Sequence, residues 1–238
     1  MTNETLLAFI RQPESRGDYN IVWGGIKRTD WPKRPLVKMT IGEVLAWQDS
    51  IDASYNSEAA GAYQMMEDTL RGDPKSGTPA LYILAGLTAS DLFNEDNQDA
   101  MAVALLRRRG LDSFLDGTIS AEAFANRLAM EWASLPVVTP VKRTVGRKSW
   151  TVQRGASYYA GDGLNKAHVS PDAFLAAVLS VKASDPAPAP DLAPPAKITP
   201  KPVAPAAPAP TPIKGSFLLS LIGWLLSLKP IRKLFGGK

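Results

Sequence analysis

The chain contains no cysteine and a single histidine, His168, among its 238 residues. Without cysteine it has no disulfide, no thiol nucleophile and no thiolate ligand for zinc. One histidine is also too few for the histidine-rich sites that hold catalytic zinc. We therefore expect no bound metal and no other cofactor.

The start of the sequence also lacks the pattern of a cleaved signal peptide. The segment MTNETLLAFIRQPE has an apolar run of five residues between charged ones. The hydrophobic region of a signal peptide is longer, about 7 to 15 residues. We expect synthesis in the cytoplasm without processing at this end.

Most of the chain has no net positive charge, and the positive excess is confined to its last part. Residues 1–184 carry 20 Lys or Arg against 21 Asp or Glu, whereas residues 185–238 carry 7 against 2. The net charge of +4 therefore comes from the last part of the chain. A folded part that is nearly neutral is not typical of a nucleic-acid-binding domain, and we expect no nucleic-acid partner.

Composition divides the chain into three regions. Residues 1–183 have the aromatic and β-branched content of one packed domain. Residues 184–212 contain eleven prolines and no aromatic residue, which predicts a disordered, extended Pro/Ala spacer of the polyproline type. Residues 213–238 are first hydrophobic and then basic, and they form a separate tail.

Periodicity within residues 1–183 is mainly helical. Leu6, Leu7 and Ile10 share one face of a helix that leads into Pro13, whose ring is expected to bend the last turn. The stretch IVWGGIKRTDWPKRPLV predicts short strands and turns. We therefore predict an α+β, mainly helical domain with a small β-containing subdomain early in the chain. Four further helices are each preceded by a residue type that caps helix N-termini: Thr40, with Glu43 completing a capping box, Asn94, Ser120 and Ser170.

One carboxylate near the start has the setting of a general acid. Glu14 lies where the first helix meets an irregular segment, within PESRGDYN. A carboxyl group at a helix end that faces a cleft is desolvated, which raises its pKa and keeps it protonated for donation to a leaving oxygen. A solvated glutamate is the common alternative. The neighbouring tripeptide Arg16-Gly17-Asp18 has the form of an adhesion signal, but we assign it no function.

Six stretches occur in the order known from one enzyme family: PESRGDYNIVWGG, TDWPKRP, SEAAGAYQ, QDAMAVALLRRRG, EWASLP and SYYAGDG. Together they span nearly all of residues 5–182, and the sequence resembles the phage lambda endolysin family of lytic transglycosylases. The resemblance implies a lysozyme-like fold and cleavage of peptidoglycan glycan strands between N-acetylmuramic acid and N-acetylglucosamine. It also implies that Glu14 acts alone, first as acid on the glycosidic oxygen and then as base on the muramoyl C6 hydroxyl, which leaves an anhydro-muramic end.

The resemblance also suggests which residues bind substrate. Tyr63 and Gln64 match a cleft wall, where tyrosine packs on a sugar face and glutamine pairs with an acetamido group. Gly61 would permit close backbone approach. A core position is the alternative for Tyr63. The other members of the predicted substrate-binding set are Ser57, Tyr158 and Tyr159.

Glu58 departs from the family pattern, because relatives tend to carry a small hydroxylated residue there. If its side chain entered the cleft opposite Glu14, it could serve as the base of an inverting hydrolase, and the enzyme would be a hydrolytic muramidase. The other interpretation is that Glu58 points to solvent on a loop. A rival for the whole chain is a virion structural protein with a subsidiary lysozyme-like module.

Two further features have structural explanations. Trp132, at helical spacing, is expected in the core. A buried helix ends with Arg107, Arg108 and Arg109, and cations are favoured at a helix C-terminus and solvated there.

The tail has the pattern of a membrane-active segment. Residues 216–228 would form a helix of about 20 Å, shorter than the ~30 Å hydrocarbon core of a bilayer. Basic residues follow, each adding ~1 kcal/mol of attraction to an anionic leaflet. The tail would anchor or target the enzyme, or would disrupt an outer membrane. Its predicted contact residues are Phe217, Trp224, Lys229, Arg232 and Lys233.

These features predict where the protein acts. A monomeric catalytic domain would cleave peptidoglycan in the periplasm or cell wall, for host lysis or entry. The tail would bind the bacterial membrane, and association with the membrane or with the virion follows as an expectation.

Overall fold

The structure, a computed structural model, describes residues 3–161 and 165–183. These residues belong to one compact unit, Met1–Asp185. The predicted spacer and the predicted tail, with its contact residues between positions 217 and 233, lie outside the described residues. The three-region organisation therefore stays a prediction.

Helices dominate the described residues, so the predicted α+β, mainly helical class is confirmed. The strands β1, Val141–Val145, and β2, Lys148–Val152, form an antiparallel hairpin. None of the described helices has the length and hydropathy needed to cross a membrane. The helices are α1, Glu4–Ser15; the 3-10 helices η1, Arg28–Asp30, and η2, Leu36–Lys38; α2, Ile41–Ile51; α3, Glu67–Arg71; α4, Leu81–Leu84; α5, Glu95–Arg108; α6, Leu111–Leu115; α7, Ala121–Ala129; and α8, Pro171–Ala183.

The predicted capping residues begin the predicted helices. At the start of α2, the Thr40 hydroxyl accepts the Glu43 N–H at 3.2 Å and the Glu43 carboxylate accepts the Thr40 N–H at 2.7 Å. The side chains of Asn94, Ser120 and Ser170 each accept the N–H three residues further on. The starts of α2, α5, α7 and α8 are thus set by local hydrogen bonds.

The β structure lies elsewhere than predicted. Residues 21–37 form 3-10 turns and one isolated bridge, Val22 to Ala60, rather than strands. Pro32 and Pro35 interrupt this segment and have no N–H to donate to a strand ladder. The strands form late, with Val141 opposite Val152. Most of their side chains are exposed, so the sequence there lacks the alternation that predicts a half-buried strand.

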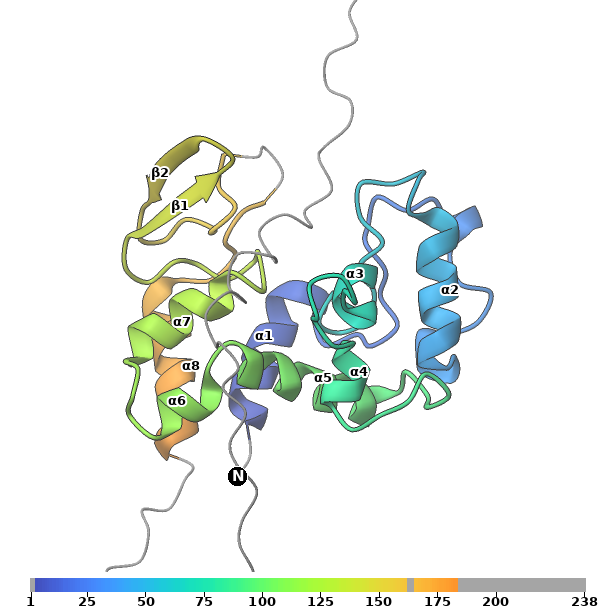
Figure 1. The fold of residues 1–238 in the computed structure, drawn as a ribbon, viewed down its shortest axis with the longest axis horizontal. Coiled ribbons are helices and arrows are strands. Elements are labelled where there is room, and N and C mark those ends of the chain that lie inside the picture. Colours follow the sequence, from blue (N-terminus) through green and yellow to red (C-terminus); the bar gives the residue numbers. More distant parts are fainter. Residues whose placement is uncertain (1–2, 162–164, 184–238) are drawn as a thin grey trace, which may run out of the picture. The chain divides into compact units, whose positions relative to one another are not determined.

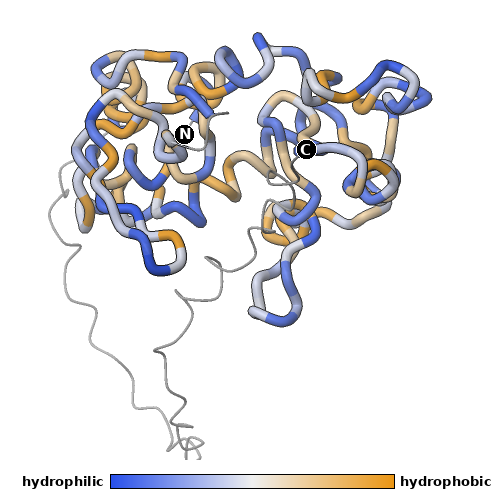
Figure 2. The backbone as a smooth tube through the Cα atoms, turned by 90° about the horizontal axis from the view of Figure 1, so that it is seen from above, coloured by the Kyte–Doolittle hydropathy of each residue, from blue (hydrophilic) through white to orange (hydrophobic). Residues whose placement is uncertain are grey.

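Helix α1 runs between two groups of elements (Figure 1). On one side lie α6, α7, α8 and the hairpin β1–β2, which we call the hairpin lobe. On the other side lie α2, α3 and α4, which we call the α2 lobe. Helix α5 contacts α4 and also α6, so it connects the two lobes. Seen from above, the lobes lie side by side, with hydrophilic segments along the outer loops (Figure 2).

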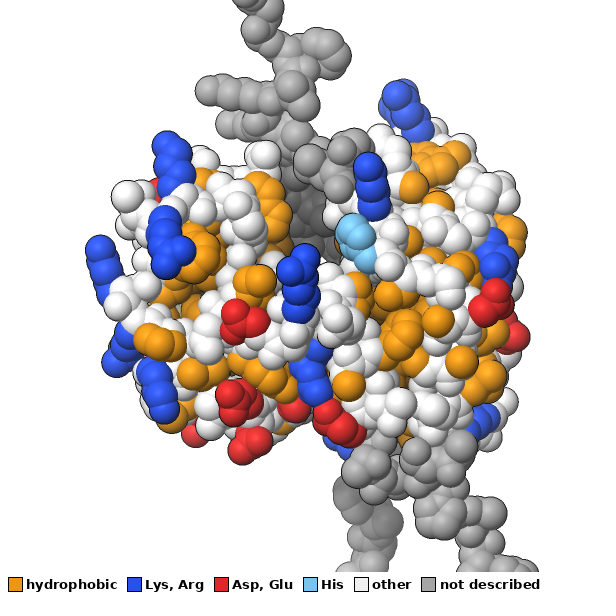
Figure 3. Space-filling view, turned by 180° about the vertical axis from the view of Figure 1, so that it is seen from behind, with side chains coloured by type: hydrophobic (Ala, Val, Ile, Leu, Met, Phe, Trp, Pro, Cys, Tyr) orange, Lys and Arg blue, Asp and Glu red, His pale blue; other side chains and the backbone are white. Residues whose placement is uncertain are grey.

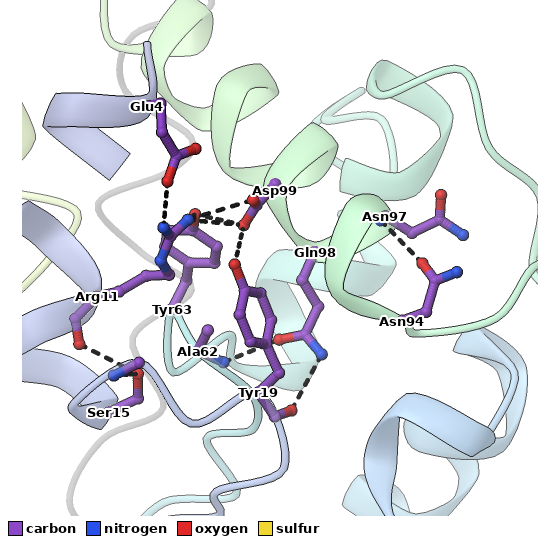
Figure 4. A network of polar contacts seen from close by, with 11 residues as sticks. Glu4, Arg11, Ser15, Tyr19, Ala62, Tyr63, Asn94, Asn97, Gln98 and Asp99 are labelled. Carbon is purple, nitrogen blue, oxygen red and sulfur yellow. Dashed lines mark hydrogen bonds and ion pairs between the residues drawn. The ribbon is translucent and has the colours of Figure 1, made fainter. Parts of the chain in front are cut away.

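A buried glutamine fastens α5 to the loops around it. Gln98 has no solvent exposure. Its amide nitrogen donates to the carbonyls of Tyr19, at 3.1 Å, and Phe93, at 2.9 Å. Its amide oxygen accepts the N–H of Ala62 at 2.8 Å (Figure 4). One side chain therefore satisfies three backbone groups from three separate segments.

We predict that Gln98→Ala lowers the free energy of unfolding by about 3 kcal/mol or more, because it leaves buried backbone groups without partners. Urea unfolding monitored by circular dichroism measures this. Gln12→Ala, at an exposed position of α1, is the control and should change stability by less than about 0.5 kcal/mol. Equal stabilities for the two variants would contradict the proposed role of Gln98.

Candidate active site

Glu14 lies in the last turn of α1. The helix continues through Pro13 to Ser15, and Arg16 then ends it in the left-handed conformation, with φ of 57°. The buried Ser15 hydroxyl donates to the Arg11 carbonyl and accepts the Gly17 N–H, both at 3.1 Å. The Ser15 side chain therefore fixes the helix end that carries Glu14 by bonding to backbone groups on both sides of it.

A serine from a distant part of the chain binds the Glu14 carboxyl group. The Ser134 hydroxyl donates to Glu14 Oε1 at 2.5 Å. Ser134 follows α7 and is 6% exposed. Its carbonyl accepts the backbone N–H of His168 at 2.8 Å, so the segment before α8 fixes it in turn.

Burial raises the pKa of Glu14 above its ordinary value, while hydrogen bonds from Ser134 act in the opposite direction. Burial is the larger effect because moving the charged form out of water costs more than one hydroxyl donor returns. A carboxyl group with a raised pKa keeps its proton closer to neutral pH. It can then donate that proton to a leaving oxygen.

Hydrogen bonds bring several of the motif segments together beside Glu14. The Trp132 indole N–H donates to the Tyr63 carbonyl at 3.2 Å, which ties the SEAAGAYQ turn to the EWASLP segment. Pro136 and Ser157 form an isolated bridge, and Val137 N–H donates to the Ala156 carbonyl at 2.8 Å. Stretches that are far apart in the sequence thus converge around Ser134.

Tyr63 occupies the core. Its side chain is 1% exposed, and its ring lies 6.5 Å from that of Trp132, itself buried as predicted. The Tyr63 hydroxyl donates to Asp99 at 2.6 Å and accepts from Arg11 at 2.9 Å (Figure 4). Burial, reinforced by the Asp99 carboxylate, raises the pKa of Tyr63. A ring without solvent exposure cannot offer its face to a sugar, so this geometry supports the core interpretation.

Gln64 and Gly61 form the turn that carries Tyr63. Gln64 adopts a left-handed backbone, with φ of 48°, which is strained for a residue with a side chain. It is half-buried, and its amide donates to the Gly61 carbonyl at 3.0 Å. Gly61 also has a positive φ, and a Cβ there would lie 2.2 Å from Gln98 Oε1. The close approach that Gly61 permits is therefore to Gln98.

Ser57 and Glu58 contact the start of α3. The Ser57 hydroxyl lies 3.4 Å from the sulfur of Met66. Glu58 is 5% exposed, and its carboxylate accepts the N–H of Glu67 at 3.2 Å. The interpretation that Glu58 points to solvent is therefore wrong. Its burial is explained by the first amide of α3, which gives the carboxylate a partner.

Tyr158 and Tyr159 are half-buried and meet edge to face at 5.4 Å. The guanidinium of Arg143, on β1, lies over both rings and over the ring of Trp150 on β2. The Tyr159 hydroxyl donates to the Met130 carbonyl at 2.7 Å, and burial raises its pKa to about 12. Tyr159 is thus a packing residue anchored to the end of α7, while Tyr158 lies beside the hairpin.

The arginines at the end of α5 are less solvated than predicted. Arg108 and Arg109 are 21% and 14% exposed, and both pair with Glu131, which is 6% exposed. Only Arg107 of the three matches the predicted exposed position. The physical reason is that the carboxylate of Glu131, in the EWASLP segment, is buried and therefore requires cationic partners. Ser134 belongs to the same segment, and that position in the motif is the signal that could have identified it.

We predict that Ser134→Ala raises the pKa of Glu14 further, because the hydrogen bond that favours the carboxylate is lost. The protonated acid then persists to higher pH, so the alkaline limb of kcat/KM against pH moves upward. Loss of positioning also lowers kcat/KM by roughly tenfold. Turbidity loss of a peptidoglycan suspension across pH measures both effects.

Ser15→Ala is the matched control, since it removes a buried hydroxyl one residue from Glu14 that bonds only backbone groups. It should lower stability and leave the alkaline limb in place. A limb that moves equally in both variants would mean that Ser134 does not act on Glu14.

The comparison with known proteins agrees with this geometry. The family model described as Endolysin matches residues 8–163, which is more than half of the chain. The matched range contains Glu14, the core turn at Tyr63, Ser134 and the Tyr158–Tyr159 pair. No curated protein and no solved structure matched. The chain therefore belongs to the endolysin family, the peptidoglycan-degrading enzymes of phages.

Proposed function

We propose that the protein is a lytic transglycosylase that uses Glu14 as its only catalytic carboxyl group. Protonated Glu14 donates to the glycosidic oxygen, and the bond from that oxygen to muramoyl C1 breaks. The resulting carboxylate accepts the proton of the muramoyl C6 hydroxyl, whose oxygen bonds to C1. The products are a free N-acetylglucosamine hydroxyl and a 1,6-anhydro-muramic end. Glu14 is protonated again, and no water is consumed.

The observation that carries the proposal is the environment of Glu14. Its carboxyl group is desolvated and bonded to a neutral hydroxyl, and its pKa is raised. Such a group serves first as acid and then as base. It lies at the end of the central helix α1 (Figure 1), and the surface is hollowed between the two lobes (Figure 3).

The state of Glu58 supports a reaction without a second carboxylate. An inverting hydrolase requires a carboxylate that holds and activates a water molecule across the sugar ring. Glu58 is buried, and its carboxylate accepts an amide of α3. This structural role accounts for a glutamate at position 58 and favours the transglycosylase over the hydrolytic muramidase.

Mass spectrometry of the muropeptides released from purified peptidoglycan distinguishes the two reactions. We predict anhydro-muramic ends from the wild type and a loss of release of about a hundredfold or more in Glu14→Gln. Glu58→Gln is the matched control, because glutamine keeps an oxygen that can accept the Glu67 N–H. It should retain both the rate and the anhydro products.

Three outcomes would contradict this proposal. Reducing muramic ends that disappear in Glu58→Gln would establish a hydrolase with two carboxylates. Release by Glu14→Gln at the wild-type rate would remove Glu14 from the reaction, whereas no release by the wild type would favour the virion structural alternative.

We further propose that the sequence of residues 213–238 gives the enzyme a membrane-binding tail, so that a monomeric catalytic domain cleaves the wall close to a membrane. The support is the apolar run at 216–228 followed by Lys229, Arg232 and Lys233. Burial of apolar side chains and attraction to anionic headgroups would act together.

Co-sedimentation with anionic phospholipid vesicles tests the tail. We predict that the full chain binds at least about tenfold more tightly than a chain ending at residue 185, and that high salt weakens its binding. Equal binding by the two chains would assign any membrane affinity to the catalytic domain instead.

A further inference from the structure

The α2 lobe carries a pocket that the proposed reaction does not use. Its volume is about 730 Å³, and it lies between α2 and the segment of residues 29–34. Neither Glu14 nor Ser134 lines it. Trp31, Trp47, Tyr55 and Pro32 provide aromatic and apolar walls, and the buried Met39 and Ile51 lie at its base.

Internal hydrogen bonds fix the two indole rings. The Trp31 N–H donates to the Ile26 carbonyl at 3.0 Å, and the Trp47 N–H donates to the Asp30 carbonyl at 2.9 Å. Trp31 is nevertheless 36% exposed. Rings whose polar atom is already bonded present only carbon surface, and this surface suits the apolar face of a sugar or a short side chain.

The two acidic side chains at the pocket already have partners. Asp30 accepts the Tyr55 hydroxyl at 2.5 Å. Glu43 accepts the Thr40 N–H of the capping box and pairs with Arg34. Both carboxylates therefore already bond to neighbouring groups of the protein.

Cations outnumber anions along the segment beside the pocket, whereas the lining itself holds two of each, Lys33 and Arg34 against Asp30 and Glu43. Residues 27–38 contain five Lys or Arg and one Asp. The exposed Lys33 and Arg34 line the pocket, and the Arg28 guanidinium lies 5.2 Å from the centre of the Trp31 ring. Figure 3 shows Lys and Arg side chains gathered on this lobe, at the left of the view. A guanidinium stacked on an indole keeps its N–H groups in plane for a carboxylate.

We infer that this pocket binds the stem peptide of peptidoglycan, the anionic peptide attached to the muramoyl sugar, through Lys33, Arg28 and the Trp31 ring. The inference rests on the proposed function, because it takes peptidoglycan as the substrate. A free carboxylate of the peptide meets the cations, and an apolar part of the peptide packs on the indole.

The shape and charge of the pocket favour this occupant. A concave site with aromatic walls and a few charged groups fits a small ligand or a short peptide segment. A bilayer surface would instead meet a protruding apolar face. Because peptidoglycan presents the same peptide many times, a second contact in addition to the catalytic site raises the residence time on the polymer.

Binding is measured apart from cleavage by using the full chain with Glu14→Gln as the parent protein. The probe is insoluble peptidoglycan, either intact or treated with an amidase that removes the stem peptides. We expect Trp31→Ala and Lys33→Glu each to weaken co-sedimentation with intact peptidoglycan about fivefold to tenfold. With the stripped glycan, each should match the parent within about twofold.

Lys33→Glu keeps the experiment decisive if Trp31→Ala perturbs its loop, since Lys33 is exposed. The matched controls are Arg107→Glu, the same charge change at a 64% exposed side chain, and Ile83→Ala, at a 58% exposed apolar residue on α4. Both should bind as the parent does.

Three results would overturn the inference: unchanged binding of Lys33→Glu to intact peptidoglycan, equal losses on intact and stripped glycan, or losses seen only with anionic vesicles. A parent that binds neither form would overturn it as well. Each of these leaves the proposed reaction standing if the wild type still releases anhydro-muramic ends, so the two failures are distinguishable.

Discussion

The ion pair between Arg11 and Asp99 is the interaction on which the site depends. Arg11 Nη1 lies 3.1 and 3.2 Å from the two Asp99 oxygens, and the same carboxylate accepts the hydroxyls of Tyr19 and Tyr63. The network joins α1, the loop after it, the core turn and α5 (Figure 4). With the neighbouring Gln98, it fixes the helix that carries Glu14 against the rest of the enzyme. A part-buried network in which each member has a partner favours one arrangement.

Local patterns predicted the parts of the fold that local bonds determine. The capping residues Thr40, Asn94, Ser120 and Ser170 begin the expected helices because each bond spans only three residues. Helical periodicity also predicted that Trp132 is buried, although α7 ends at Ala129 and Trp132 lies beyond it. The position of Glu14 at the end of α1 was predicted correctly, because the sequence alone gives the number of residues between Glu14 and the apolar residues of that helix.

Features that depend on distant partners were not predictable from the sequence. Ser134 is 120 residues from Glu14, so local periodicity gives no sign of that bond, and only the place of Ser134 in the EWASLP motif points to it. The burial of Glu58 depends on an amide nine residues away, and that of Glu131 on arginines from another helix. The hairpin β1–β2 was missed because its side chains are mostly exposed, so its stability comes from backbone pairing, which leaves little hydrophobic signature.

The chemistry of Glu14 follows from how charge is distributed around α1. Arg11 lies on the same helix, three residues before Glu14, and its guanidinium is directed to Asp99 and Glu4. A cation bonded to Glu14 would hold it as a carboxylate and lower its pKa. The partner is instead the neutral hydroxyl of Ser134, which can donate to the carboxylate or accept from the acid. The same ion pair that fixes the fold therefore leaves Glu14 able to exchange its proton, as the proposed transglycosylase reaction requires of a single carboxyl group.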